Sequence, residues 1–523
     1  MSVGATASDV HADKPRSDVR SLARGGALTL VSSVTGTFLG FLLTVVVTRG
    51  LQARAAGAFF VAVGLFTILS NTTELGADTG LVRAISRARA LGRTGDLRRL
   101  VRVAMLPVLI GATVIAVAMF ALAPALADLV LHGIARHEAT QLLRVLAPFL
   151  PIGAASAVVV SGTRGFGTMI PYVALEYLGK PALRPLLMLA VVFAGLGIGA
   201  ASLAWALPLA IGFVVALAMT WRLIRAAERA APGSVEPARP RGALAGEFWR
   251  FAGPRGFAGI FQATVVWLDV LLIGAFRSTA EAGIYTAASK LAMLGTFGLE
   301  AVRLALAPQI SGLLARNEHR RVEHLYQIGT WWMVAMCWPL YVGLLLYGSL
   351  VLKVFGPEFA AGETALLVLS LAALIDLGTG NVTVMLLMGG KSSWNMINTL
   401  AALVVNIGLN VLLLPRMGIT GAAIAWAASI AVDNLAALVE VWLFLGLSPF
   451  GRGYLRVSVQ AVACYGLVGL VTTWWLGVTI PSLLVFGVVA TVVYAVLVWR
   501  SRGLLELATL AEAVRLRLKD DKG

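Results

Sequence analysis

Residues 248–310 read FWRFAGPRGFAGIFQATVVWLDVLLIGAFRSTAEAGIYTAASKLAMLGTFGLEAVRLALAPQI. The stretch consists of two apolar runs joined by a short polar turn at 277–281. Each run reaches about 20 residues, the length that an α-helix needs to cross the hydrocarbon core of a bilayer. The stretch therefore predicts a pair of transmembrane helices.

Ionisable side chains lie inside these two apolar runs, at Arg255, Asp269, Lys290, Glu300 and Arg303. A charge at the bilayer centre costs about 2.5–3.5 kcal/mol on insertion scales, so each of these residues is a candidate for function.

The composition of the whole chain is that of a polytopic membrane protein. Of its 523 residues 59% are hydrophobic and only 13% are charged. The net charge of +16 does not indicate nucleic-acid binding, because the basic residues lie in short loops between apolar runs. No His lies in a clear span, so we expect no catalytic metal site.

The chain contains about fourteen apolar runs that are long enough to span a bilayer. We place them at residues 26–48, 57–77, 101–125, 141–161, 172–195, 199–221, 249–275, 283–306, 325–347, 363–388, 395–414, 419–446, 455–476 and 480–499. An even number of spans puts both termini on one side of the membrane.

Charge predicts which side that is. Most of the 42 Lys and Arg residues lie in the segments that share a side with the termini. By the positive-inside rule, the tails at 1–25 and 500–523 are cytoplasmic, in the cytoplasmic membrane of a bacterium. The outer loops are short and leave no room for a catalytic domain, so we do not expect an enzyme.

Two sequence repeats predict a duplicated architecture. Gly57-Ala58-Phe59 matches Gly283-Ile284-Tyr285, 226 positions later, and residues 197–205 resemble residues 418–426. We therefore expect an all-α protein with an N-lobe at 26–222, a cytoplasmic linker at 223–248, a C-lobe at 249–446 and two further helices at 447–499. Because each lobe has six helices, the repeats share one orientation across the membrane.

The fifth span carries Glu176, Lys180 and Arg184 at successive i, i+4 positions, which form one charged stripe. Pro181 and Pro185 interrupt the helical hydrogen bonds there, as is tolerated where a helix lines a cavity. One interpretation is an internal Glu176–Lys180 ion pair, and the other is a cavity that Lys180 or Arg184 faces.

The second span and its repeat carry charges with a predicted structural or gating role. Glu74 is followed by Asp78 one turn later and by Arg83, where a basic segment begins that suits anionic headgroups. The repeat mate of Glu74 is Glu300, which precedes Arg303 at ion-pair spacing.

Carboxylate and amide residues in other spans are candidates for coupling to Na⁺ or H⁺. Asp269 has no cation near it in sequence, and Asn406 and Asn410 lie one turn apart in the eleventh span. Their oxygens suit a cation, whereas hydrogen bonding between amides is the alternative. Asp376 and Asp433 lie within the tenth and twelfth spans and suggest the same role more weakly. We expect no cofactor.

Several passages resemble one family. They are Thr48-Arg49-Gly50-Leu51 running into Gly57, Leu75-Gly76 leading to Arg83, Asp269-Val270-Leu271-Leu272-Ile273-Gly274 running into 282–288, and Asn406–Asn410 leading into 414–423. The chain resembles polysaccharide and O-antigen flippases, in the superfamily that also contains lipid II flippases and multidrug-and-toxin extrusion antiporters.

The resemblance implies two six-helix lobes around a central cavity, where cations receive the diphosphate of a polyprenyl-linked oligosaccharide. We expect Lys180, Arg184, Arg255 and Lys290 to make those contacts. A cation site of an acid on the seventh helix and polar residues on the eleventh is also implied, which Asp269, Asn406 and Asn410 match. Asn410 stands where a second acid is expected.

The predicted function is a flippase that moves this lipid-linked oligosaccharide to the outer leaflet by rocking one lobe against the other. Its expected partners are membrane lipids and a polysaccharide polymerase or glycosyltransferases, with no nucleic acid. The alternative is a cation-coupled multidrug antiporter of the same superfamily, which acidic cavities would favour. A major-facilitator transporter and a membrane glycosyltransferase fit less well.

Overall fold

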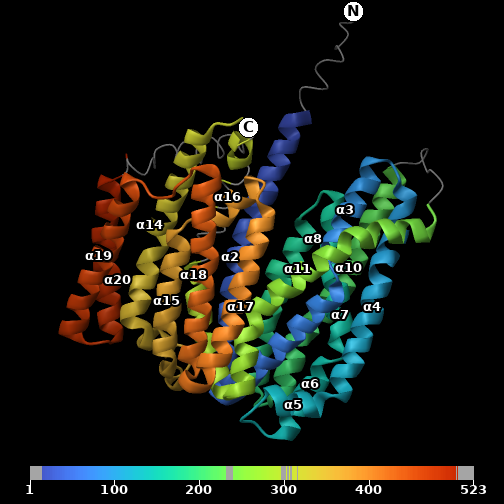
Figure 1. Ribbon diagram of the computed structural model, residues 1–523. Helices are drawn as coiled ribbons and strands as arrows, with labels where there is room; N and C mark the ends of the chain where they lie inside the picture. Colours follow the sequence, from blue (N-terminus) through green and yellow to red (C-terminus); the bar gives the residue numbers. More distant parts are fainter. Residues whose placement is uncertain are drawn as a thin grey trace, which may run out of the picture. The chain divides into compact units, whose positions relative to one another are not determined.

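The structure is a computed structural model that describes residues 14–230, 239–295, 302, 306, 309–314, 316–501 and 503. Every regular element among these residues is a helix (Figure 1). The chain divides into two compact units, Met1–Gly283 and Ile284–Gly523. The prediction of an all-α protein is therefore confirmed.

Unit 1 contains ten α-helices and one π-helix among its described residues. They are α2 (Lys14–Glu74), α3 (Ala77–Ala90), α4 (Leu97–Ala121), α5 (Ala123–Val130), α6 (Arg136–Leu146), α7 (Phe149–Thr163), α8 (Ile170–Tyr172), the π-helix η3 (Val173–Gly179), α9 (Lys180–Phe193), α10 (Ile198–Ala230) and α11 (Arg241–Phe276). Short 3₁₀ turns lie at Thr94–Asp96 and Arg164–Phe166. Helix α12 (Thr279–Ala292) crosses the division between the units and leads into the 3₁₀ turn Met293–Gly295.

The core of unit 1 lies among α3, α4, α7, α10 and the first half of α11. Leu81, Val158 and Ala216 are fully buried in it, and Phe248 of α11 packs with them. Helix α11 corresponds to the predicted span 249–275, which we assigned to the C-lobe. Its packing belongs to unit 1, so the units of the structure divide the chain later than the predicted linker does. The predicted lobe bounds stay a prediction.

Unit 2 contains a further set of α-helices among its described residues. They are α14 (His319–Leu352), α15 (Glu363–Gly378), α16 (Val382–Met388), α17 (Ser392–Met417), α18 (Ile419–Leu445), α19 (Arg452–Leu476) and α20 (Ile480–Arg500), with a 3₁₀ turn at Pro357–Gly362. Tyr347 of α14 joins the last two helices: its hydroxyl lies 2.7 Å from Thr472 Oγ1 and 2.8 Å from Ser482 Oγ. The two C-terminal helices therefore pack on α14.

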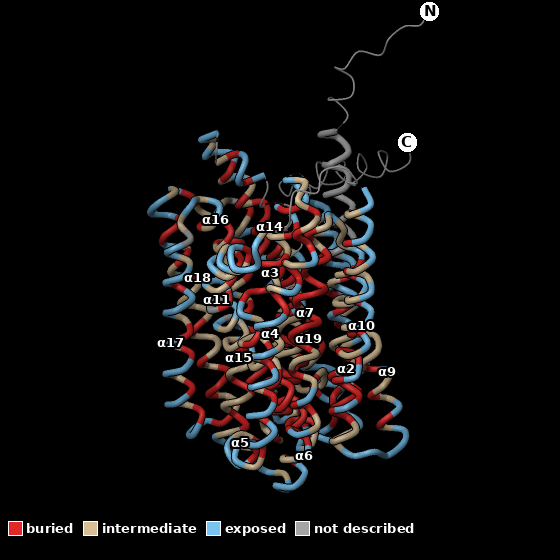
Figure 2. The backbone as a smooth tube through the Cα atoms, turned by 90° about the vertical axis from the view of Figure 1, so that its right-hand side faces the viewer, coloured by how far each residue is buried: buried red, intermediate tan, exposed pale blue. Residues whose placement is uncertain are grey.

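Helix α4 carries a continuous stripe of exposed apolar side chains. Leu106, Ile110, Val114 and Val117 are more than half exposed and recur at helical spacing, so they share one face of the helix. Figure 2 colours the backbone of this and the other helices by burial. A soluble protein rarely exposes such a continuous apolar stripe, whereas hydrocarbon covers it without cost. The chain is a membrane protein.

Eleven helices among the described residues are long and apolar enough to span a membrane, so the predicted count of fourteen is not confirmed. The difference arises at three places. Helix α2 holds the first two predicted spans, and Gln52 interrupts it with φ +63° and ψ 169°. The predicted span 172–195 is divided into short elements, and 283–306 runs beyond the described residues.

Two other boundaries differ from prediction. The predicted span 363–388 is broken at Gly380, whose φ of +73° ends α15 and separates it from α16. Helix α2 begins at Lys14, so residues 14–25, predicted as a tail, are helical. Residues 231–238 of the predicted linker lie outside the described residues.

Candidate functional site

The charged stripe of the fifth predicted span lies where the helix geometry changes. Residues Val173–Gly179 form a π-helix, and α9 begins at Lys180 with Pro181 in its first turn. Pro185 removes a further hydrogen-bond donor inside α9. π-Helical turns are uncommon and frequently mark functional sites, since they re-aim side chains relative to a regular helix.

Lys180 and Glu176 form an ion pair across this junction. The Nζ atom of Lys180 lies 2.6 Å from Glu176 Oε1, and the Lys180 side chain is only 8% exposed. Gly212 of α10 packs beside its aliphatic chain, since a Cβ there would be in ordinary van der Waals contact with Lys180 Cε, at 3.5 Å. The ion-pair interpretation of the sequence is therefore what the structure shows for these two residues.

Glu74 adds a second carboxylate to the same cluster. It lies at the end of α2, half-buried, and interacts electrostatically with Asp78, Glu176 and Lys180. One lysine thus faces more than one acid. These interactions link the end of α2 to η3 and to the start of α9 inside unit 1. The structural or gating role of Glu74 stays a prediction.

Arg184 lies one turn beyond this pair and interacts electrostatically with Glu176, but no carboxylate of the described residues lies at ion-pair distance from it. Its Nε donates a hydrogen bond to the Trp205 carbonyl oxygen at 3.2 Å, and its Cζ lies 4.2 Å from the centre of the Trp205 ring. Stacking and one carbonyl hold the guanidinium in place without neutralising it. Its remaining N–H groups suit an anionic oxygen.

Sequence reasoning missed Arg164 and Tyr172 in the same unit. The Arg164 Cζ lies 4.3 Å from the centre of the Tyr172 ring, and Tyr172 interacts electrostatically with Glu176. Arg164 follows the predicted span 141–161 and reads as an ordinary loop charge. Only the fold brings it to the π-helix.

The polar residues of unit 2 form a separate cluster. Asn434 of α18 donates to Asp376 Oδ1 of α15 at 3.0 Å, and Thr379 donates to Asn434 Oδ1 at 3.2 Å. Asp433 is the neighbour of Asn434 and is half-buried. The structure therefore brings the predicted Asp376 and Asp433 to one place, around an asparagine that the sequence did not single out.

Glu440 is a second residue that the sequence analysis missed. It is 9% exposed on α18, and Asn398 of α17 donates to its Oε2 at 2.7 Å. It lies near the end of the twelfth predicted span, where a charge reads as a boundary signal. Its burial adds a further carboxylate to unit 2.

The predicted cation site remains untested. Asn410 Nδ2 donates to the backbone oxygen of Asn406 at 3.0 Å and to its Oδ1 at 3.2 Å, so these two amides bond within one helix. Asp269 is buried on α11 in unit 1, whereas both asparagines belong to unit 2. Their joint use for a cation stays a prediction.

The other predicted residues lie in different settings. Arg255 is exposed on α11, with its Cζ 6.0 Å from the centre of the Phe251 ring. Lys290 is half-buried on α12, in unit 2. Glu300 and Arg303 lie outside the described residues, so their pairing stays a prediction.

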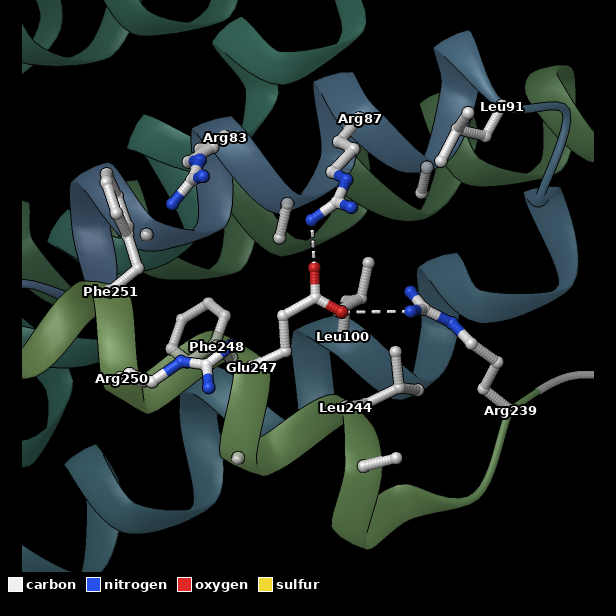
Figure 3. A pocket seen from close by; sticks show the side chains of 15 residues that line it. Arg83, Arg87, Leu91, Leu100, Arg239, Leu244, Glu247, Phe248, Arg250 and Phe251 are labelled. Carbon is white, nitrogen blue, oxygen red and sulfur yellow. Dashed lines mark hydrogen bonds and ion pairs between the residues drawn. The ribbon is translucent and has the colours of Figure 1, made fainter.

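A basic pocket of about 690 Å³ lies at one end of unit 1, between α3 and the start of α11 (Figure 3). Arg83, the predicted gating residue, lines it together with Arg87, Arg239 and Arg250. A hydrogen bond to Asp96 raises the pKa of the Arg239 guanidinium above its ordinary value.

Comparison with known families shows which family the chain belongs to. The family described as polysaccharide biosynthesis protein matches residues 22–313, more than half of the 523 residues. The chain belongs to this family. The MatE family also matches, over residues 254–412.

This polysaccharide biosynthesis protein has two similar curated relatives, both from Haloferax volcanii. The probable low-salt glycan biosynthesis flippase Agl15 is 27% identical over 178 residues, which are 32% of this chain and 36% of the relative. The probable flippase AglR is 26% identical over 208 residues, which are 38% of this chain and 43% of the relative. The matched part thus spans less than half the length of either relative.

Solved structures share the fold. The lipid II flippase MurJ in an inward closed conformation superposes with a TM-score of 0.72 at 12% identity, over 92% of this chain and 100% of MurJ. An inward-facing multidrug transporter of the MATE family gives 0.66 at 15% identity, over 80% of this chain and 98% of the transporter. The polysaccharide biosynthesis protein therefore has the architecture that these two groups of membrane proteins share.

Proposed function

We propose that the protein is a flippase that carries a polyprenyl-diphosphate-linked oligosaccharide from the cytoplasmic to the outer leaflet for cell-surface polysaccharide synthesis. The family and the names of the two relatives support this function, as does the MurJ-like fold. The single observation that carries it at the level of residues is Arg184, a guanidinium within the fifth predicted span that forms no ion pair with any residue the structure describes.

The physical requirement is to move a diphosphate through a region where water is scarce. Such a head loses its hydration in hydrocarbon unless cations replace it. A guanidinium binds two phosphate oxygens through parallel N–H groups, which suits it to this task better than an ammonium does. Arg184 is thus the principal contact, and Lys180, Arg255 and Lys290 are the further contacts that we propose.

Transport would alternate the exposure of the site to the two sides of the membrane, by motion of one lobe against the other. We propose Na⁺ or H⁺ as the coupling ion, with Asp376, Asp433, Asp269, Asn406 and Asn410 as its candidates. No cofactor is needed, since no bond in the substrate is made or broken. The protein would lie in the cytoplasmic membrane with both termini inside, supplied by glycosyltransferases.

The second candidate is a cation-coupled multidrug antiporter. The MatE match over residues 254–412 favours it, and so do the acidic residues of unit 2. Cationic drugs require acidic surroundings, whereas the fifth predicted span presents a guanidinium. We therefore rank polysaccharide transport first.

Deletion of the gene from its host separates the two functions. The flippase function predicts loss of surface polysaccharide and accumulation of the lipid-linked oligosaccharide, with unchanged drug susceptibility. The reverse pattern, with normal polysaccharide and increased sensitivity to cationic drugs, would support the antiporter instead.

A further inference from the structure

The basic pocket of unit 1 combines four arginines with a single carboxylate in its lining. Arg83 and Arg87 come from α3, Arg239 precedes α11, and Arg250 and Glu247 lie on α11. Figure 3 shows Glu247 between Arg87 and Arg239, with Arg83 and Phe251 at the opposite end of the pocket from Arg239. The lining therefore carries a clear excess of positive charge.

Glu247 already serves as a counterion for two of the arginines. It forms an ion pair with Arg87, and its Oε2 lies 2.9 Å from Arg239 Nη1. Arg239 also bonds the buried Asp96, whose Oδ2 lies 2.9 Å from its Nε. Asp96 thus holds Arg239 in position, so that one side of the pocket is fixed independently of any ligand.

Arg83 and Arg250 are held less closely by this carboxylate. Glu247 interacts electrostatically with Arg83, but the two residues form no ion pair in the described part of the chain. The Arg83 guanidinium lies over the Phe251 ring, with its Cζ 4.0 Å from the ring centre. In the part of the chain that the structure describes, neither arginine makes an ion pair. Two orientable guanidinium groups at the edge of one cavity match the oxygens of a phosphate group, which they can bind bidentately.

The start of α11 also indicates the depth of this pocket in the membrane. The face opposite Glu247 lines an apolar groove of about 570 Å³ with Leu106 and Pro107 of α4, and Trp249 lies in that groove beside Arg102 and Arg241. Tryptophan and arginine together at the end of an apolar helix mark the headgroup level of a bilayer. A phosphate in the basic pocket would lie at that same level.

We propose that the pocket of Arg83, Arg87, Arg239 and Arg250 binds the phosphate of an anionic phospholipid headgroup, with Glu247 as the internal counterion that this phosphate displaces. The site is separate from Lys180 and Arg184 and does not depend on the transported substrate. The lipid phosphate would take the place of the Glu247 carboxylate beside Arg87 and Arg239, and it would also contact Arg83 and Arg250. The pocket would thereby tie α3 to α11 through a lipid.

Binding of phosphatidylglycerol to the purified full-length protein tests this proposal, by native mass spectrometry and by competition in nanodiscs. We expect the Arg83→Ala/Arg250→Ala variant to lose about tenfold in affinity, since each 1.4 kcal/mol corresponds to a factor of ten. The matched control is Arg54→Ala, which removes an exposed arginine of unit 1 outside the pocket. Equal losses in both variants would overturn the proposal.

Glu247→Gln should change the lipid affinity in the opposite direction. It therefore tests the proposal even if the double variant Arg83→Ala/Arg250→Ala fails to fold. The change removes the competing charge, so phosphatidylglycerol should bind several-fold more tightly, and phosphatidylcholine should not. Unchanged or weaker phosphatidylglycerol binding by a folded Glu247→Gln variant would contradict the role of Glu247.

Inorganic phosphate and pyrophosphate distinguish the source of the phosphate group. A lipid site predicts that neither anion stabilises the detergent-solubilised protein against heat and that phosphatidylglycerol does. Stabilisation by the free anions that disappears in Arg83→Ala/Arg250→Ala would overturn the lipid as the occupant and assign the pocket to a soluble phosphate compound.

Discussion

Gly57 of α2 and Gly283 of α12, which are equivalent in the sequence repeat, pack directly against one another. A Cβ on Gly57 would lie 2.7 Å from the Gly283 nitrogen and would overlap the carbonyl of Thr279. A Cβ on Gly283 would lie 2.7 Å from the carbonyl oxygen of Ala53. Since Ala53 and Thr279 are also 226 positions apart, the two contacts are reciprocal, as a two-fold relation between repeated segments produces.

This contact predicts that Gly57→Ala destabilises the protein. The new methyl group meets backbone atoms that have no rotamer to change, so the cost should exceed the about 1–3 kcal/mol typical of overpacking. Thermal unfolding in detergent measures it. Gly40→Ala is the matched control, because a Cβ at Gly40 meets nothing within 4 Å. Equal melting temperatures for the two variants would contradict the close approach.

The ion pair of Lys180 and Glu176 predicts a stability effect that is distinct from transport. Glu176→Gln removes the only ion pair that the described residues make with this nearly buried ammonium and leaves it the more distant Glu74, so the cost should approach the about 3–5 kcal/mol typical of a broken buried pair. The double variant Glu176→Gln/Lys180→Met should recover most of that stability, since it removes both charges.

Transport by the double variant then decides the role of Lys180. If Lys180 contacts the diphosphate, a well-folded double variant exports little polysaccharide. Normal export by that variant, at normal protein levels, would leave Lys180 with a structural role only.

Substitution of Arg184 should reduce polysaccharide export by more than the loss of its positive charge explains. Arg184→Ala should lower polysaccharide export by about tenfold or more, as loss of ~1.4 kcal/mol of binding to the transported head predicts. Arg184→Lys should restore only part of it, because an ammonium keeps the charge and loses the planar stacking on Trp205.

Export is compared at equal amounts of membrane-inserted protein. Arg98→Ala, which breaks an exposed pair with Glu228, serves as the control and should export normally. Full export by Arg184→Ala would remove Arg184 from the substrate site.

Asp376 is the coupling candidate whose surroundings are best defined. Asn434 and Thr379 form a hydrogen-bonded chain to its carboxyl group. Asp376→Asn should abolish the stimulation of transport by a Na⁺ or H⁺ gradient and leave slow, gradient-independent transport. Asp128→Asn, on an exposed ion pair with Arg136, should not change the stimulation. Full gradient dependence in Asp376→Asn would exclude Asp376 from coupling.

Much of this fold follows from the hydropathy pattern, because a membrane requires each spanning segment to be apolar and to satisfy its own backbone. Among the described residues of unit 2, the pattern predicted α14, α17, α18, α19 and α20 to within several residues. It failed where local geometry interrupts an apolar run, as at Gly380 and the π-helix Val173–Gly179. Neither interruption changes hydropathy, so no average over a window detects it.

The candidate site was predictable only where its residues share one helix. Glu176, Lys180 and Arg184 follow each other at helical spacing, and an ion pair between Glu176 and Lys180 was one of the two interpretations of their stripe. Trp205, Arg164 and Asn434 meet their partners from other helices. Tryptophan and asparagine are ordinary in apolar or loop sequences, so only tertiary packing shows which of them contact a charge.

Transport of a labelled polyprenyl-diphosphate oligosaccharide in liposomes tests the central claim most directly. The purified protein is reconstituted with the fluorescent lipid, and a membrane-impermeant quencher reports how much of it reaches the outer leaflet. We predict transfer that requires the protein, is slowed in Arg184→Ala and is normal in Arg98→Ala. Transfer no faster than in protein-free liposomes, by a preparation that moves a cationic drug, would contradict the flippase function.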